Sequence, residues 1–267
     1  MTYFGVLLRF VGPPLVILAA ITVYDLAHGK RMPSHYRTWP AWAVFVGHIA
    51  IALVYTTPWD NYLVATRVWW YEPSLVTGIT LGWVPIEEYT FFVVQTMVAG
   101  LWLLAIMRRL RRPEQPFVQR RALRWSATTV GAILWAGSLA SLLIGWAQGE
   151  YMALIGLWFL PPILLQFVFG ADILWHYRRL VLYGILPPFV YLCLVDAIAI
   201  HSGTWTINPD NILGVYLSGV LPLEEMTFFL VTNVLIVFGM VLMLAIESHV
   251  RAGTRPGKVW RELQVDQ

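Results

Sequence analysis

Two pairs of adjacent glutamates are the residues in this chain best suited to acid–base chemistry. Residues 85–92 are Pro-Ile-Glu-Glu-Tyr-Thr-Phe-Phe and residues 222–229 are Pro-Leu-Glu-Glu-Met-Thr-Phe-Phe, so the two segments are identical at six of eight positions. Each segment stands at the start of a long apolar run. Carboxylates are costly within a membrane helix, so two matched pairs indicate a shared chemical role. The candidate catalytic residues are Glu87, Glu88, Glu224 and Glu225.

Each pair stands where a helix is expected to begin. Proline at the first helical position and acidic residues in the first turn also occur at ordinary helix starts, which is the alternative explanation. Adjacent glutamates point in different directions around a helix, so the two members of a pair should differ in role. Glu88 shares a thin polar stripe with Gln95, and Glu225 shares one with Thr232 and Asn233. This stripe predicts that the second glutamate of each pair faces inward.

The composition places these glutamates in a membrane. The chain is 58% hydrophobic and 12% charged, with a mean hydropathy of +0.66, which leaves too little polar surface for a soluble globule. Continuous apolar runs separated by charged loops predict an all-α integral membrane protein with about seven transmembrane helices, and they argue against a β-barrel. The runs lie near residues 4–24, 40–56, 84–107, 127–147, 151–169, 180–200 and 218–246.

Loop charges predict the orientation of this bundle. With the N-terminus outside and the C-terminus in the cytoplasm, sixteen lysines and arginines fall in inner segments and Arg67 alone falls in an outer loop. The net charge of +3 therefore indicates topology and contact with anionic lipids, and no nucleic-acid partner is expected. We expect a multi-pass protein of the cell membrane.

The segment around each glutamate pair belongs to a longer internal repeat. Matching residues recur at an offset of 136, whereas the glutamates recur at 137, so one residue is inserted between Gly214 and Pro222. Proline pairs at 13–14 and 161–162 extend the repeat upstream. The residues matched at 136 are Asp60, Trp69, Pro73 and Gly78 with Asp196, Trp205, Pro209 and Gly214.

The helix count determines how the two repeats are related. After three membrane crossings the chain lies on the opposite side from where it started, so a second three-helix unit joined directly would be inverted. One linking helix returns the chain to the starting side and makes the two units parallel repeats. Both glutamate pairs then enter from the same leaflet and converge on one cavity. We expect a first repeat at 1–107, a basic loop and linking helix at 108–150, a second repeat at 151–250 and a basic tail at 251–267.

Several classes of membrane protein lack support in these residues. A retinal protein needs a lysine in its last helix, but the lysines are Lys30 and Lys258, both outside the spans. The six histidines are too scattered for a di-iron or zinc site, and no Gly-x-Gly-x-x-Gly occurs, so we expect neither a metal nor a cofactor. A proton-coupled transporter remains the alternative, because intramembrane carboxylates in parallel repeats are equally typical of transporters. A catalytically silent scaffold is a third possibility.

Residues 85–88 and 222–225, each preceded by the matched Asp, Trp and Pro residues, resemble the signature of the membrane-embedded lycopene cyclases. The resemblance is to the form of the family in which two small subunits are fused. The resemblance covers residues 1–107 and 151–246. It implies proton-initiated, non-redox cyclisation of the ψ-end groups of lycopene to β-ionone rings, giving γ-carotene, β-carotene or both. The family pattern Pro-x-Glu-Glu/Asp favours Glu87 and Glu224 as the length-sensitive positions, against the polar stripe.

Such a reaction needs an acid, a base and a wall that tolerates a cation. Aromatic faces stabilise a cation without trapping it, although simple packing and interfacial anchoring are alternative roles for these rings. The expected partners are lycopene or a related acyclic carotenoid, membrane lipids and other carotenoid enzymes. The candidate substrate-binding residues are Asp60, Asn61, Trp69, Phe91, Phe92, Asp196, Trp205, Phe228, Phe229 and Asn233.

Overall fold

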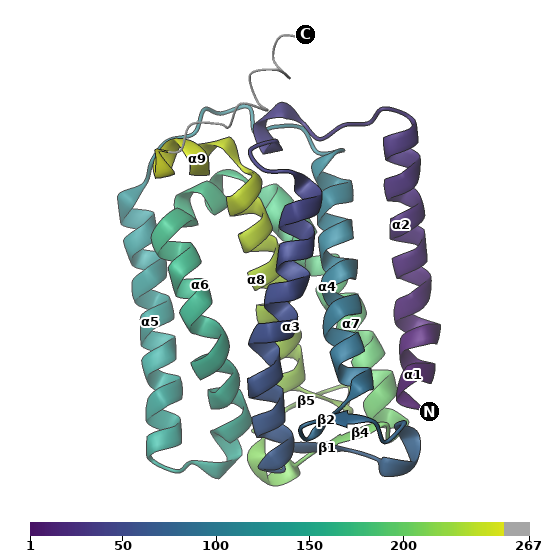
Figure 1. The fold of residues 1–267 in the computed structure, drawn as a ribbon. Coiled ribbons are helices and arrows are strands. Elements are labelled where there is room, and N and C mark those ends of the chain that lie inside the picture. The colour runs from purple at the N-terminus through teal and green to yellow at the C-terminus, as the bar shows by residue number, and fades with distance from the viewer. Residues whose placement is uncertain (254–267) are drawn as a thin grey trace.

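The computed structural model describes residues 1–253 as a bundle of long helices (Figure 1). Seven helical segments in this part of the chain are long and apolar enough to cross a membrane, which confirms the predicted fold class. A π-helical turn at Leu7–Val11 joins the first two helices into one span. The long helices and the short first one are α1 (Tyr3–Val6), α2 (Gly12–Ala27), α3 (Ala41–Ala65), α4 (Ile86–Met107), α5 (Arg121–Leu143), α6 (Glu150–His176), α7 (Arg178–His201) and α8 (Leu223–Leu244).

Helix α3 runs further than the apolar pattern alone indicated. The hydrophobic run ends near residue 56, but the helix continues through Pro58 to Ala65. Asp60 therefore lies inside the last turns of a spanning helix and is only 1% exposed. Helices α4 and α8 begin later than the apolar runs that contain them, because the residues before each helix form strands.

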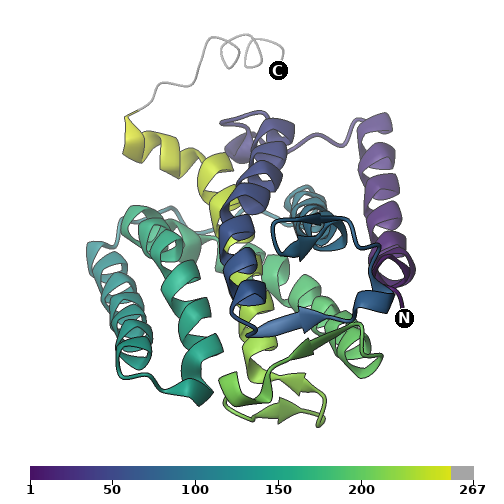
Figure 2. The ribbon, with the colours of Figure 1, turned by 60° about the horizontal axis from the view of Figure 1, so that its bottom comes forward.

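A two-stranded ribbon crosses one end of the bundle (Figure 2). Strand β1 (Trp69–Tyr71) pairs antiparallel with β4 (Trp205–Ile207), with Trp69 opposite Ile207 and Tyr71 opposite Trp205. Trp69 and Trp205 are equivalent in the two repeats, so the pairing is symmetric about its centre. This symmetry is what parallel repeats related by an axis along the bundle produce.

Each glutamate helix is preceded by a small β-hairpin. Strands β2 (Thr80–Leu81) and β3 (Val84–Pro85) are joined by a two-residue turn, and β5 (Tyr216–Leu217) and β6 (Leu221–Pro222) are joined by a three-residue turn. The residue inserted in the second repeat is therefore a turn residue. Gly82 is required in the first turn: its φ is +69°, and a Cβ atom there would lie 2.2 Å from Oδ1 of Asn61.

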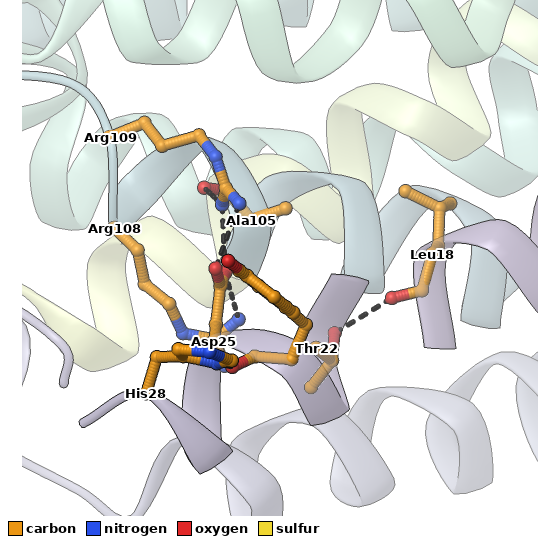
Figure 3. Close-up of polar contacts among 8 residues, drawn as sticks. Leu18, Thr22, Asp25, His28, Ala105, Arg108 and Arg109 are labelled. Atoms are coloured by element: carbon orange, nitrogen blue, oxygen red, sulfur yellow. Dashed lines mark hydrogen bonds and ion pairs between the residues drawn. The ribbon is translucent and has the colours of Figure 1, made fainter. Parts of the chain in front are cut away.

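Ion pairs join the helices at the opposite end of the bundle. The carboxylate of Asp25 in α2 lies 2.8 Å from the guanidinium of Arg109 and 3.6 Å from that of Arg108 (Figure 3). Both arginines directly follow α4. Arg251 of α9 (Ile246–Ala252) pairs with Asp172 of α6 at 2.8 Å. Helix α5 packs on α6 at the side of the bundle, as a linking helix would. The predicted basic tail at 251–267 lies outside the described residues from position 254 onward.

Candidate functional site

Helices α4 and α8 begin at the same end of the bundle, beside the β1–β4 ribbon (Figure 1). Between them lies one buried cavity of about 30 Å³, to which both repeats contribute carboxyl groups. Glu88 and Glu225, one from each pair, therefore converge on this cavity, whereas Glu87 and Glu224 do not line it. The residues lining the cavity are Tyr3, Trp59, Asp60, Trp69, Glu88, Phe91, Phe92, Tyr151, Asp196, Trp205, Ile207, Glu225, Phe228 and Phe229.

The second glutamate of each pair faces this cavity and accepts hydrogen bonds from tyrosines. Oε2 of Glu88 accepts from the hydroxyl groups of Tyr3 and, at 3.2 Å, Tyr71. Oε1 of Glu225 accepts from the hydroxyl of Tyr151 at 2.7 Å. Burial, together with nearby acidic groups, raises the pKa of the Tyr71 phenol, so Tyr71 keeps its proton and remains a donor.

The first glutamate of each pair points elsewhere and anchors a loop. Oε1 of Glu87 accepts from the backbone N–H of Thr77 at 2.6 Å, and Oε1 of Glu224 accepts from that of Leu213 at 2.8 Å. Both side chains are almost completely buried, at 1% and 0% exposure, yet neither lines the cavity. A shorter side chain would not reach these amides, so the geometry gives both positions a reason to be length-sensitive without contact with a reacting molecule.

Two aspartates complete the acidic lining, and they differ in their partners. Neither oxygen of Asp60 has a hydrogen-bond partner among residues 1–253. Oδ1 of Asp196 accepts from the indole Nε1 of Trp205 at 3.1 Å, whereas the equivalent indole nitrogen of Trp69 has no partner in the described part of the chain. A buried carboxyl group without a donor favours its neutral, protonated form. The cavity thus combines carboxyl groups in unlike surroundings.

Aromatic rings form the remaining wall. Trp59 stacks on Phe228 with ring centroids 5.4 Å apart, and Phe91 meets Phe229 edge-on at 6.1 Å. Tyr3 packs against Trp205 at 4.8 Å. Such faces can stabilise a cation by about 0.5–2 kcal/mol each. The arrangement provides proton donors, proton acceptors and a cation-tolerant surface in one buried cavity. Within residues 1–253, no group of three or more His, Cys, Asp or Glu side chains is arranged to hold a metal ion.

Besides Glu87 and Glu224, two of the ten predicted substrate-binding residues lie outside this cavity. Asn61 holds the first hairpin instead: its Oδ1 accepts from the N–H of Trp83 at 2.7 Å and its Nδ2 donates to Tyr89 at 2.9 Å. Nδ2 of Asn233 donates to the backbone carbonyl of Phe229 at 2.8 Å, which turns this amide back onto its own helix. The other eight predicted substrate-binding residues, together with Glu88 and Glu225, line the cavity.

The sequence analysis missed the three tyrosines that bond the glutamates. A signal for two of them was present, because Tyr3 and Tyr151 are separated by 148 residues, the same offset as the proline pairs beginning at Pro13 and Pro161. Tyr71 has no such signal, since the equivalent position in the second repeat is Ile207. In the described part of the chain, Glu88 therefore has two phenol donors and Glu225 has one.

A family comparison bears directly on this cavity. A sequence model of the lycopene cyclase family matches residues 7–108 and 148–244, which are the two repeats without the linking segment. The chain belongs to the lycopene cyclase family. All four carboxyl groups of the cavity fall within the matched segments.

Individual relatives agree with this assignment. A protein of Halobacterium salinarum named lycopene beta-cyclase is 37% identical over 252 residues, which cover 90% of this chain and 95% of the archaeal protein. A bifunctional lycopene cyclase/phytoene synthase of Podospora anserina is 40% identical over 200 residues, and a protein of the same name in Aspergillus oryzae is 36% identical over 197 residues. Each match covers 72% of this chain and 33% of the fungal protein. No solved structure matches the chain.

Proposed function

We propose that this protein is a lycopene β-cyclase of carotenoid biosynthesis, and that the cavity between the two repeats is its active site. The main observation is that four carboxyl side chains from the two repeats meet among aromatic rings in one buried cavity. Membership of the lycopene cyclase family and the name of the archaeal relative support the reaction type. Both comparisons point to cyclases, and neither supports the transporter alternative.

The reaction begins with proton transfer to the terminal double bond of a ψ-end group. The resulting tertiary cation is attacked by the neighbouring alkene, which closes the ring and moves the positive charge onto a ring carbon. Asp60 is our candidate for the initial acid, because its carboxyl group is buried without a donor and so favours the protonated form. The rings of Trp59 and Phe228 stand at the cavity wall, where they would stabilise the cation.

The reaction ends when the cation loses a proton and the ring alkene forms. Glu88 and Glu225 are the candidate bases, because both accept hydrogen bonds from tyrosines and such bonds stabilise a carboxylate, whereas Asp60 has no donor among residues 1–253. One proton enters and one leaves, so no oxidant, reductant or cofactor is needed. The β ring forms when the proton leaves the ring carbon that has just made the new C–C bond, and the archaeal relative's name favours this outcome.

The surroundings of the site follow from the same proposal. Lycopene dissolves only in a bilayer, so we place the protein in the cell membrane as a multi-pass protein in contact with membrane lipids. The arginine-rich end, where Arg109 and Arg251 form ion pairs, is assigned to the cytoplasm, and the ribbon end to the outer face. Other enzymes that make or use carotenoids are candidate neighbours in the membrane.

The function is tested by giving lycopene to the purified protein in lipid vesicles prepared in D₂O. Chromatography with mass spectrometry should show cyclic products that carry one solvent-derived deuterium per ring, because the entering proton comes from a carboxyl group that exchanges with water. The same vesicles with Asp60→Asn protein serve as a comparison and should form little product. Unchanged lycopene with the unmodified protein would refute the proposed function.

A further inference from the structure

A second cavity lies in the membrane-spanning part of the bundle, between α3, α4, α6 and α8. Its volume is about 200 Å³, several times that of the acidic cavity. The walls are mainly apolar, with Tyr55, Phe159, Pro162 and Leu235 among the lining residues. Ile51 at its rim is 62% exposed, so the cavity reaches the lipid-facing surface of α3.

The two cavities share part of their wall. Phe92 and Phe228 line both of them, and each stands one turn beyond a glutamate that faces the acidic cavity. Phe228 stacks on Trp59, which lines the acidic cavity, and meets Phe159, which lines the larger one, at 5.7 Å. A hydrocarbon that passes between these rings would therefore reach the carboxyl groups directly.

The other side of the acidic cavity is closed. Tyr3 is 1% exposed there, and the ribbon residues Trp69, Trp205 and Ile207 are each 8% exposed. An apolar chain arriving from the ribbon end would have to displace this packed layer and cross water first. The lipid-facing cavity is the route that keeps such a chain in apolar surroundings throughout.

Most polar side chains that line the larger cavity have a hydrogen bond within the protein. Nε2 of Gln95 donates to Oγ1 of Thr232 at 3.0 Å, and that hydroxyl in turn donates to the carbonyl of Phe228 at 2.9 Å. These two side chains need no hydrogen bond from an occupant, whereas Oε1 of Gln166 has no partner among residues 1–253. From Phe228 to Ile236 the cavity follows α8 for about 12 Å, given the rise of an α-helix.

We propose that this lipid-facing cavity holds the extended polyene chain of the substrate while one end group lies in the acidic cavity. The inference rests on the proposed function and adds the place and the direction of substrate entry: from the bilayer, between α3 and α6, past Phe92 and Phe228. An end group can then enter the acidic cavity only with its chain trailing through this opening.

A covalent block tests the proposal after the protein has folded. Ala52 lines the cavity on α3, and Ala50 is exposed two residues away on the same helix without lining it. We would prepare Ala52→Cys and Ala50→Cys, measure lycopene cyclisation in vesicles, and repeat the measurement after reaction with a bulky apolar maleimide. Unmodified protein treated in the same way controls for the buried Cys193.

The labelled Ala52→Cys protein should lose about tenfold or more in kcat/KM, whereas labelled Ala50→Cys should stay within about twofold of its unlabelled form. Ala52→Trp should show the same loss, with thermal unfolding confirming that the protein is folded. Full activity of labelled Ala52→Cys would overturn the inference, as would equal losses at both positions. If a structural lipid filled the cavity, the label at position 52 would displace it, lower the unfolding temperature and leave kcat/KM unchanged. That result would also contradict the inference.

This outcome is distinct from failure of the proposed function. If the unmodified protein does not cyclise lycopene at all, the function is wrong and the entry route has no substrate. If the unmodified protein is active and the block at position 52 has no effect, the function stands and the entry route is wrong.

Discussion

The phenol that bonds Glu225 gives the most specific expectation from this site. Tyr151 is the hydrogen-bond donor found for the Glu225 carboxylate, at 2.7 Å, whereas Glu88 has both Tyr3 and Tyr71. Replacing Tyr151 by Phe removes a hydrogen bond to a charged group, which is worth about 1.5–3 kcal/mol. If Glu225 acts as a carboxylate in the rate-limiting step, the rate should fall roughly 10- to 160-fold. Tyr71→Phe should cost less, because Glu88 keeps the bond from Tyr3.

The assay compares initial rates of lycopene conversion in vesicles that contain equal amounts of folded protein. Tyr191→Phe is the matched control, since the hydroxyl of Tyr191 donates to the backbone carbonyl of Phe10 at 2.5 Å and bonds to no carboxyl group among residues 1–253. Its rate should stay within about threefold of the unmodified protein. The reasoning is refuted if Tyr151→Phe behaves like Tyr191→Phe, or if Tyr71→Phe is the more damaging change.

Three further expectations concern the anchors and the single cavity. Glu87→Gln keeps an oxygen for the N–H of Thr77 and should retain activity within about tenfold, whereas Glu87→Asp, too short to reach it, should lose more in the same rate assay. Gly82→Ala should lower the free energy of unfolding by about 1–3 kcal/mol in thermal melts, and more than Gly29→Ala, because both have positive φ but only the first would clash. Since both repeats share one small cavity, the two ends of a substrate must be closed in turn, so a time course should show a transient monocyclic product, and its absence would favour two sites.

The internal repeat was the part of this molecule that sequence could predict best. Apolar runs predicted the seven helices, and the matched segments together with the number of crossings predicted parallel halves and converging glutamates. The polar stripe also indicated which glutamate faces the cavity, since Gln95 does bond to Thr232 across the two helices. The catalytic roles of Glu88 and Glu225 remain proposals.

The rest depended on contacts that periodicity does not encode. Asn61 was a candidate substrate-binding residue, but its amide bonds the hairpin beside it and Tyr89. Tyr71 could not be distinguished from the many aromatic residues expected at a membrane interface. The lipid-facing cavity depends on how α3 and α6 separate around α8, and no local pattern in one helix contains that information.

The central claim is that the two cavity-facing glutamates serve one active site. Glu88→Gln and Glu225→Gln keep the size of the side chain and remove its charge, so each can be compared with the unmodified protein at equal insertion and equal thermal stability. The measurement is the rate of ring formation from lycopene in vesicles. We expect each variant to lose at least about 100-fold, as removal of a general acid or base does. Wild-type rates in both variants would contradict the account.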